Sequence, residues 1–599
     1  MKQFLKYVLA TVVGVILVSV VFFFLSIATL VGMAGMQSNS AKVEKNTVLV
    51  IKLEGSLSER TEDNPFSSLL GSSLAEQQGL TNILKAIEKA KSEDKIRGIY
   101  IEAGTFMGAT PAMLQEIRNA LLDFKASGKF IVSYGDNYTQ GTYYLASVAD
   151  SVVVNPQGII DWSGMALQTM YYKDMLDKLG VKMQVFKVGT YKSAVEPFLL
   201  NDMSEANREQ LSLIADEVWD QIVNDVSKSR KIMPAVLNQL ADSCIALTQP
   251  QQYKKAHMVD KLAYSDDVPH IIANMMDGAD TSDDYNTITA SELSSIADNE
   301  PKGTSGNVIA VYYAYGSIVQ EASTGFGGIS GEHEIVGRQV IKDLRELADN
   351  DDVKAVVLRV NSGGGSAYAS EQIWHEVMNI KQKKPIIVSM GGMAASGGYY
   401  ISCAADWIVA EPTTLTGSIG IFGMFPEASE LMNQKLGLHV ATVKTNEHAD
   451  LGLSMARPFN ASESALLQRY INNGYELFTR RCADGRKMKQ ADIKAIAEGR
   501  VWTGLHAKKL GLVDQLGSLK DAIAVAEKRA NIKEYSIMDY PSGGSMLDNL
   551  LKEAQGNSYA DTRLKAALSE YYDIFAQFHN INNKTGIQAS LPYHLRFNL

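Results

Sequence analysis

The chain has 599 residues, 46% of them hydrophobic and 21% charged, so it is too long for one core and too hydrophobic for wholesale disorder. Its formal net charge of −10 argues against nucleic acid as a main partner. The three cysteines, an odd and sparse set, give neither a disulfide framework nor metal-ligand spacing, and we expect no cofactor.

The N-terminal segment is a long apolar run. Lys2 and Lys6 precede it, and residues 7–36 contain no charged side chain. A helix that crosses a bilayer needs about 20 apolar residues, whereas the core of a signal peptide has about 7–15, so we expect one transmembrane anchor within residues 1–41. Lysines before the run and a long folded region after it predict that the N-terminus is cytoplasmic and that the bulk of the chain lies outside the cytoplasm.

Strands and helices alternate through residues 42–280. The expected helices cover residues 80–91 and 111–124. Short runs of strand-forming residues between and around them predict strands over 47–53, 96–101 and 129–134. This alternation is typical of a parallel α/β sheet.

The same order of elements returns in residues 307–545. Residues 134–144 align without a gap with residues 390–400, and residues 152–156 align with residues 408–412. We therefore predict a duplicated α/β unit. We expect an anchor over residues 1–41, a first repeat over 42–280 and a polar linker over 281–306. A second repeat over 307–545 and a tail of amphipathic helices over 546–599 follow.

The stretch 385–405 contains the strongest candidate for chemistry. A β-type run, two glycines and the sequence Met-Ala-Ala-Ser-Gly-Gly precede an apolar helical segment. Ser396 is therefore expected at a sharp turn from strand to helix, near the positive end of a helix dipole and among small residues that let a peptide backbone approach. A nucleophilic hydroxyl needs such a setting. The alternative is a glycine-rich turn in which Ser396 only caps the helix.

A serine hydroxyl needs a base that takes its proton. His375, His439 and His448 lie in surroundings typical of surface or packing residues. The first repeat has Gln140 at the position of Ser396, but it contains Lys192 in a stretch for which the second repeat has no matching lysine. Apolar and aromatic side chains flank this lysine, and burial among them would lower its pKa toward neutrality. A solvated lysine in a loop is the alternative.

A glycine run follows the expected strand that ends at Val360. Residues 361–366 read Asn-Ser-Gly-Gly-Gly-Ser, and their backbone N–H groups could stabilise the oxyanion of an acyl-transfer reaction beside Ser396. A glycine run after a strand also suits a phosphate loop. No Gly-Lys-Ser/Thr follows, which argues against that use.

Four motifs, residues 191–198, 360–366, 389–399 and 415–423, together resemble the signal peptide peptidase A family, also called protease IV, in its long duplicated form. The resemblance covers almost the whole chain, and its one departure is Gly363, where family members commonly have proline. It implies a ClpP/crotonase-like α/β fold in each repeat, preceded by one transmembrane helix.

The resemblance also implies a Ser/Lys dyad without histidine. Ser396 would be the nucleophile, Lys192 the general base and Ser418 the residue that orients the lysine, while Gly364 and Gly397 would give the oxyanion N–H groups. Members of the family form homotetramers and degrade signal peptides that remain after secretion. The implied partners are thus peptide substrates and the membrane, with the bulk of the chain on the periplasmic side of the cell inner membrane.

Three further expectations remain open on the sequence alone. A pocket lined by residues such as Met393, Ile421 and Phe422 would favour small or apolar side chains near the scissile bond. A non-catalytic, membrane-anchored scaffold that binds peptides without cutting them is the runner-up to the peptidase. A crotonase-type acyl-CoA enzyme is the third interpretation, and a location outside the cytoplasm argues against it.

Overall fold

The computed structural model of the chain describes residues 42–61, 77–276, 285–296, 306–322, 333–453, 455–541 and 586–590, together with residues 14 and 18. Within these residues no helix is both long and apolar enough to cross a membrane. The expected anchor lies outside the described residues except for residues 14 and 18, as do much of the expected linker and nearly all of the expected tail.

The first repeat contains a parallel sheet. Its strands follow in the order β8 (Asn286–Thr289), β1 (Thr47–Ser58), β3 (Ile96–Met107), β4 (Phe130–Gly135), β5 (Ser151–Val154) and β7 (Lys261–Leu262). A short strand, β2 (Gln77–Gly79), pairs with the end of β1. The helices of this repeat include α2 (Leu80–Ser92), α3 (Pro111–Lys125), α4 (Gln140–Ala146), α7 (Glu205–Arg230), α8 (Pro234–Asp242), α9 (Pro250–Lys255), α10 (Val268–Met275) and α11 (Ala290–Ser295). Residues 285–296, expected within the linker, thus contain strand β8 of the first sheet and helix α11.

The second repeat has the same parallel order of strands. They are β20 (Ser536–Tyr540), β9 (Val308–Tyr315), β12 (Val353–Ser362), β14 (Ile386–Ala395), β15 (Trp407–Ala410) and β19 (Gln515–Leu516). The end of β14 also pairs with β16 (Leu415–Gly417), which pairs in turn with β18 (Val501–Thr503). The repeated strand order agrees with the predicted duplication.

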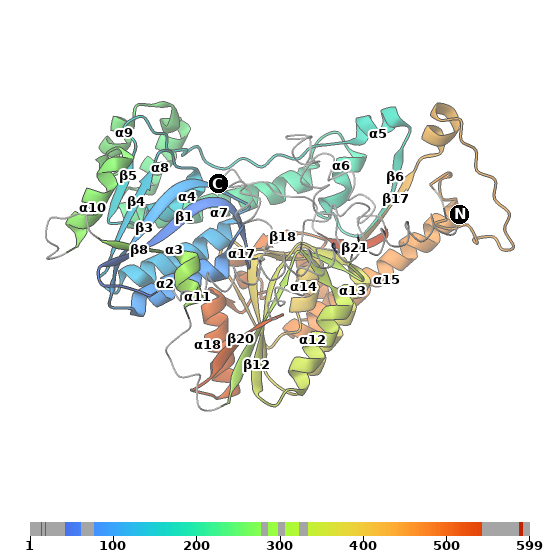
Figure 1. The fold of residues 1–599 in the computed structure, drawn as a ribbon. Coiled ribbons are helices and arrows are strands. Elements are labelled where there is room, and N and C mark those ends of the chain that lie inside the picture. Colours follow the sequence, from blue (N-terminus) through green and yellow to red (C-terminus); the bar gives the residue numbers. More distant parts are fainter. Residues whose placement is uncertain are drawn as a thin grey trace.

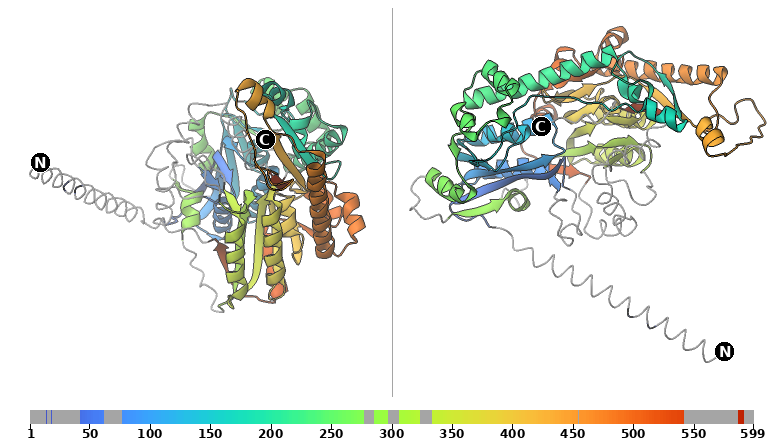
Figure 2. Two further views of the ribbon diagram at one scale, coloured as in Figure 1. Left: turned by 90° about the vertical axis from the view of Figure 1, so that its right-hand side faces the viewer. Right: turned by 90° about the horizontal axis from the view of Figure 1, so that it is seen from above.

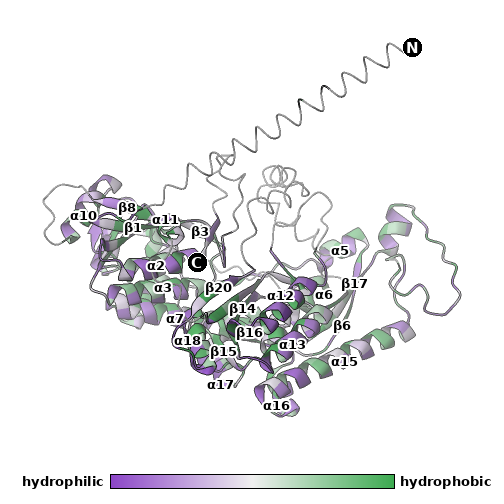
Figure 3. Cartoon of the chain, turned by 60° about the horizontal axis from the view of Figure 1, so that its bottom comes forward, coloured by the Kyte–Doolittle hydropathy of each residue, from purple (hydrophilic) through white to green (hydrophobic). Residues whose placement is uncertain are grey.

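Helices pack around both sheets (Figure 1). In the second repeat they are α12 (Gly337–Asp349), α13 (Ala367–Lys381), α14 (Gly397–Ser402), α15 (Ala461–Arg486), α16 (Gln490–Ile496), α17 (Gly504–Lys509) and α18 (Leu519–Ala530). Hydrophobic residues predominate in the central strands, and hydrophilic residues lie on the helix faces that point away from the sheets (Figure 3). Each repeat has a large apolar core, and Leu415 and Val501 of the second repeat pack into the core of the first.

A third sheet connects distant parts of the chain. Its order is β11 (Glu334–Val336), β10 (Ser317–Val319), β13 (Gly364–Ser366), β21 (Gly586–Ser590), β17 (Phe422–Glu427) and β6 (Lys182–Lys187). The antiparallel pairing of β6 with β17 brings a segment of the first half of the chain against the second repeat. Beyond β17, the chain leading to α15 projects from the body of the molecule (Figure 2). Residues 586–590, expected in a helical tail, are instead a strand.

Candidate active site

Ser396 lies at the turn between β14 and α14, as the sequence predicts. Its side chain is fully buried, and its backbone has φ 54° and ψ −112°. This left-handed conformation costs a non-glycine residue about 1–3 kcal/mol and persists only where the surrounding structure holds it. Here the Ser396 N–H donates to the Gly417 carbonyl at 2.8 Å, and the Ser396 carbonyl accepts from the Tyr400 N–H at 2.8 Å. The hydroxyl is therefore held in one place by the backbone.

Lys192 meets Ser396 although 204 positions separate them in the sequence. Its Nζ lies 2.9 Å from Ser396 Oγ, 3.0 Å from Ser418 Oγ and 3.2 Å from the Ser418 carbonyl oxygen. All three side chains are fully buried. Burial disfavours the charged form of the amine and lowers the pKa of Lys192 to about 7. One chain thus supplies both the hydroxyl and an amine of which about half is neutral near pH 7.

The pairing of β6 with β17 explains how a lysine of the first repeat reaches the second. Lys187 at the end of β6 is the register partner of Phe422, so the following loop begins beside the second repeat. The Tyr191 N–H donates to the Glu498 carbonyl at 3.0 Å, which holds the loop one residue before the lysine. Gly499 has φ +79°, and a Cβ built on it would lie 2.6 Å from Lys192 Cβ. Only glycine leaves room for the lysine at this position.

Ser418 lies next to the Lys192 amine and, like Ser396, has a strained backbone with a positive φ. Its φ is 50°, and its N–H donates to the Arg500 carbonyl at 2.7 Å. The preceding residue, Gly417, also has a positive φ, 75°. Ser418 offers both its hydroxyl and its carbonyl to Lys192, so it fixes the direction in which the amine points.

The two glycines with a predicted oxyanion role lie next to each other. A Cβ built on Gly364 would lie 2.6 Å from the backbone nitrogen of Gly397. Gly364 has φ +98°, and its N–H donates to Ser362 Oγ at 3.0 Å. This intramolecular acceptor was not expected from the sequence. The hydroxyl of Ser362 donates in turn to the Gly316 carbonyl at 2.6 Å, which fixes it beside Gly364.

Sequence reasoning missed Gln210, which holds the loop of Lys192. Its amide nitrogen donates to Ser193 Oγ at 2.9 Å, and its amide oxygen accepts from the Val501 N–H at 3.2 Å. Gln210 is buried on α7 beside Leu211. The sequence could have indicated this residue, because it is a glutamine on the buried face of an amphipathic helix and a buried amide needs hydrogen-bond partners.

In the first repeat, Gln140 occupies the position that corresponds to Ser396. It begins α4 just as Ser396 precedes α14. Its amide oxygen accepts from the N–H groups of Ser163 and Gly164 at 3.2 and 3.0 Å, and its amide nitrogen donates to the Gly164 carbonyl at 3.2 Å. The amide is thus engaged with backbone, which suits a structural role.

The other candidates do not join this cluster. His375 and His439 are exposed, in keeping with the surface role expected of them. Met393, Ile421 and Phe422, expected to line one pocket, pack in three different apolar clusters. Within the described residues no group of acidic, histidine or cysteine side chains could hold a metal ion.

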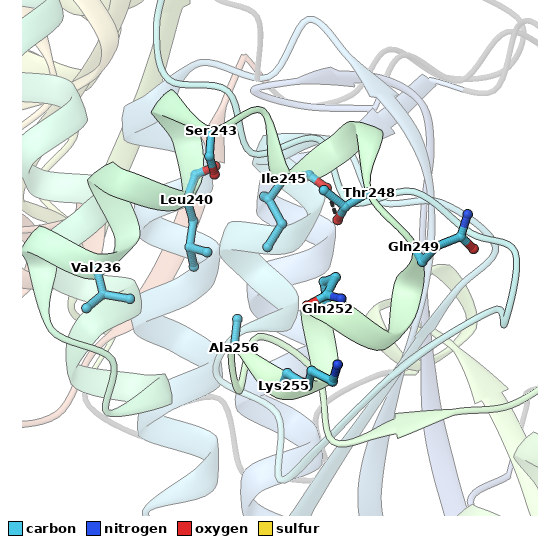
Figure 4. A pocket seen from close by; sticks show the side chains of 9 residues that line it. All are labelled: Val236, Leu240, Ser243, Ile245, Thr248, Gln249, Gln252, Lys255 and Ala256. Atoms are coloured by element: carbon cyan, nitrogen blue, oxygen red, sulfur yellow. Dashed lines mark hydrogen bonds between the residues drawn. The ribbon is translucent and has the colours of Figure 1, made fainter.

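A separate pocket lies in the first repeat (Figure 4). It has a volume of about 570 Å³ and is formed by α8, α9 and the turn between them. Its lining residues are Val236, Leu240, Ser243, Ile245, Thr248, Gln249, Gln252, Lys255 and Ala256. Lys255 is the one charged residue among them and is exposed, so this lining offers no pair of groups for acid–base chemistry.

Comparison with known families accounts for most of this architecture. The model of peptidase family S49 matches residues 123–281 and again residues 379–533, once in each repeat. The Clp protease family model matches residues 312–410, so the second repeat has a ClpP-like fold. Together these matches define a duplicated serine peptidase.

Relatives extend the match over nearly the whole chain. Protease 4 of Salmonella typhi is 38% identical over 87% of this chain and 84% of its own length. Protease 4 of Haemophilus influenzae is 35% identical over 86% of this chain and 84% of its own length. The chloroplastic serine protease SPPA of Arabidopsis thaliana is 30% identical over 88% of this chain and 76% of its own length. The chain belongs to peptidase family S49, among the signal peptide peptidase A proteins.

Proposed function

We propose that the chain hydrolyses peptide bonds with a Ser/Lys dyad formed by Ser396 and Lys192. The observation that carries the proposal is the 2.9 Å contact between the Lys192 amine and the Ser396 hydroxyl at a fully buried site. The neutral amine takes the proton of Ser396 Oγ, and the oxygen attacks the scissile carbonyl. Lys192 then gives this proton to the leaving amine. Water cleaves the resulting ester, with Lys192 again as the base.

Three further residues complete the proposed site. Ser418 orients the lysine, because its hydroxyl lies 3.0 Å from the amine. The N–H of Gly397, directly after the nucleophile, stabilises the oxyanion of the tetrahedral intermediate. The N–H of Gly364 is the second donor, and it leaves Ser362 Oγ for the oxyanion when the tetrahedral intermediate forms. A donor that changes acceptor in this way contributes only once the negative charge has formed.

The proposed substrates are extended apolar peptides, foremost the signal peptides that remain after secretion. A relative from Enterococcus faecium, the putative signal peptide peptidase SppA, is 33% identical over 39% of this chain and 70% of its own length, which supports this substrate class. The uncharged residues 7–36 support a single-pass anchor in the cell inner membrane with the bulk of the chain in the periplasm. An anchored peptidase would remain beside the bilayer, where such peptides collect.

We further propose that the chain assembles into a homotetramer. The segment between β17 and α15 exposes several large apolar side chains, which is unusual for a surface in contact with water. They are Leu436, Leu438, Val440, Val443, Leu451, Leu453 and Met455. Contacts between copies would cover this segment, and Val443→Asp should then lower the mass of the particle measured in solution.

Replacing the nucleophile separates the peptidase from a peptide-binding scaffold. Ser396→Ala should lower the hydrolysis of a fluorogenic peptide by at least about 10³-fold, since the Ser/Lys mechanism has no other nucleophile. Peptide binding and the circular dichroism spectrum should be retained. Ser291→Ala, on the exposed surface of α11, is the matched control and should keep full activity. Hydrolysis that survives Ser396→Ala would refute the assignment and favour the scaffold.

A further inference from the structure

Arg500 lies directly after Gly499 and contacts the lysine site from two sides. Its carbonyl accepts from the Ser418 N–H at 2.7 Å, so its backbone holds the residue that orients the amine. Its guanidinium lies over the ring of Tyr191, with the central carbon 4.5 Å from the ring centre. Tyr191 directly precedes Lys192 in the chain. One residue of the second repeat thus touches both the chain neighbour of the lysine and its hydrogen-bond partner.

A second ring fixes the guanidinium of Arg500. Its central carbon also lies 4.4 Å from the ring centre of Trp502. Trp502 is buried in the core of the second repeat, and its indole N–H donates to the Ile496 carbonyl at 3.0 Å. The Nε of Arg500 is buried and, among the described residues, has no hydrogen-bond partner, so stacking on the rings holds this part of the side chain. Arg500 thereby connects the rigid core to Tyr191.

The guanidinium also forms an ion pair at the surface. Its Nη2 lies 2.7 Å from the carboxylate of Glu209 on α7, to which the Tyr191 hydroxyl donates at 3.1 Å. The Glu209 side chain is 55% exposed, and an ion pair open to water contributes little to stability. α7 belongs to the first repeat and packs beside β18 of the second (Figure 1). Glu209 therefore directs the guanidinium, whereas the rings supply most of the attachment.

We propose that Arg500 is a positioning residue for the peptidase and holds Lys192 against Ser396 by stacking on Tyr191. This inference rests on the proposed Ser/Lys function. Arg500 acts through Tyr191 rather than on the reacting atoms. The stack couples the two repeats at the point where the amine of one meets the hydroxyl of the other.

The stack has two effects on the amine. It fixes the loop from which Lys192 extends, and a displacement of about 1 Å can cost about 10²-fold in rate. It also keeps water out of this loop, and the absence of water around the amine is what lowers its pKa to about 7. A loosened loop should therefore lower kcat and raise the pH at which the amine becomes neutral.

Steady-state kinetics and pH–rate profiles of the full chain with a fluorogenic peptide test the proposal. Arg500→Ala should lower kcat by about 10- to 100-fold with KM little changed, and should move the acid limb of the profile upward by at least about 0.5 pH unit. A variant that merely folds less well would lower the whole profile without moving it. Arg500→Lys keeps the positive charge but not the flat face, so it should move the limb in the same direction.

Three further variants show which contact matters. Arg529→Ala is the matched control, because Arg529 lies 4.9 Å from the ring centre of Trp407 in a contact of the same kind between α18 and β15, and it should keep the wild-type kcat and profile. Glu209→Gln removes the ion pair but keeps both rings, and should change kcat by less than about threefold. Tyr191→Leu should reproduce the loss of Arg500→Ala, and the double variant should lose little more than either single one.

The outcomes separate this inference from the proposed function. A wild-type kcat and profile in Arg500→Ala, with Ser396→Ala inactive, overturns the positioning role and leaves the dyad standing. Wild-type protein that hydrolyses no peptide overturns both proposals. A wild-type profile in Arg500→Lys would assign the effect to charge and overturn stacking, and additive losses in the double variant would overturn a role through Tyr191. Should Arg500→Ala fail to fold by circular dichroism, Arg500→Lys and Tyr191→Leu carry the same test.

Discussion

At the residue scale, the protonation state of the Lys192 amine controls the proposed chemistry. Burial lowers the pKa of Lys192 to about 7, and only the neutral amine can accept the proton of Ser396. We therefore expect kcat/KM for a fluorogenic peptide to fall about tenfold per pH unit below pH 7 and to level off above about pH 8. The measurement is a pH–rate profile of the full chain between pH 5 and 9.

Two comparisons make this profile specific to Lys192. Lys192→Ala should remove activity at every pH, whereas Lys178→Ala, on an exposed helix surface, should keep the wild-type profile. Circular dichroism across the same range would exclude unfolding as the cause of the acid limb. A rate that stays constant down to pH 5 would contradict a lysine base.

At the scale of elements, the loop before β18 leaves room for Lys192 because Gly499 in this loop has no side chain. Gly499→Ala would bring a Cβ to 2.6 Å from Lys192 Cβ and displace the amine from Ser396. A displacement of about 1 Å can cost about 10²-fold in rate, so we expect kcat to fall by one to two orders of magnitude. The measurement is steady-state kinetics of the variant, with KM little changed because the added methyl group contacts Lys192 and not the glycines of the proposed oxyanion site.

Gly511→Ala is the matched control for this substitution. Gly511 has φ +78°, nearly the value of Gly499, but a Cβ there would meet only Met488 Sδ at 3.7 Å. Both variants therefore pay about 1–2 kcal/mol for a left-handed alanine, and only Gly499→Ala disturbs the lysine. Equal losses of kcat in the two variants would attribute the effect to backbone strain.

The elements near the site were largely predictable because their signals are local. The buried strand, the glycines and the apolar helix around Ser396 are contiguous in the sequence, and the structure has the turn from β14 to α14 where it was expected. The strand β21 was not predictable, because it pairs with β13 and β17, which lie more than 150 positions earlier. The contact between Gly364 N–H and Ser362 Oγ also depends on a local backbone geometry that the glycine run alone does not define.

At the scale of the whole molecule, the two repeats are joined by a buried charge cluster. Arg359 of β12 forms ion pairs with Glu59 at 3.0 Å and with Glu116 at 2.6 Å, both in the first repeat. All three side chains are almost completely buried. Removing one partner of such a cluster leaves an uncompensated buried charge, which costs about 3–5 kcal/mol. The orientation of the repeats, and with it the approach of Lys192 to Ser396, therefore depends on this cluster being complete.

Glu411 makes this junction sensitive to pH. Burial, reinforced by the negative charge of Glu116, raises the pKa of Glu411 to about 8. The folded chain therefore holds a proton that the unfolded chain releases above about pH 4.5, and stability should fall as pH rises from about 5 to 8, by at most about 1.4 kcal/mol per pH unit. Glu411→Gln keeps the shape of the side chain and removes the titration.

The melting temperature of the full chain between pH 5 and 9 tests this account. The wild-type melting temperature should drop more steeply with pH than that of Glu411→Gln, because only the wild type must ionise a buried carboxyl group. Glu54→Gln, at an exposed position on β1, is the control and should follow the wild type. Parallel curves for the wild type and Glu411→Gln would mean that Glu411 is already ionised in the folded junction, with Arg359 compensating three carboxylates rather than two.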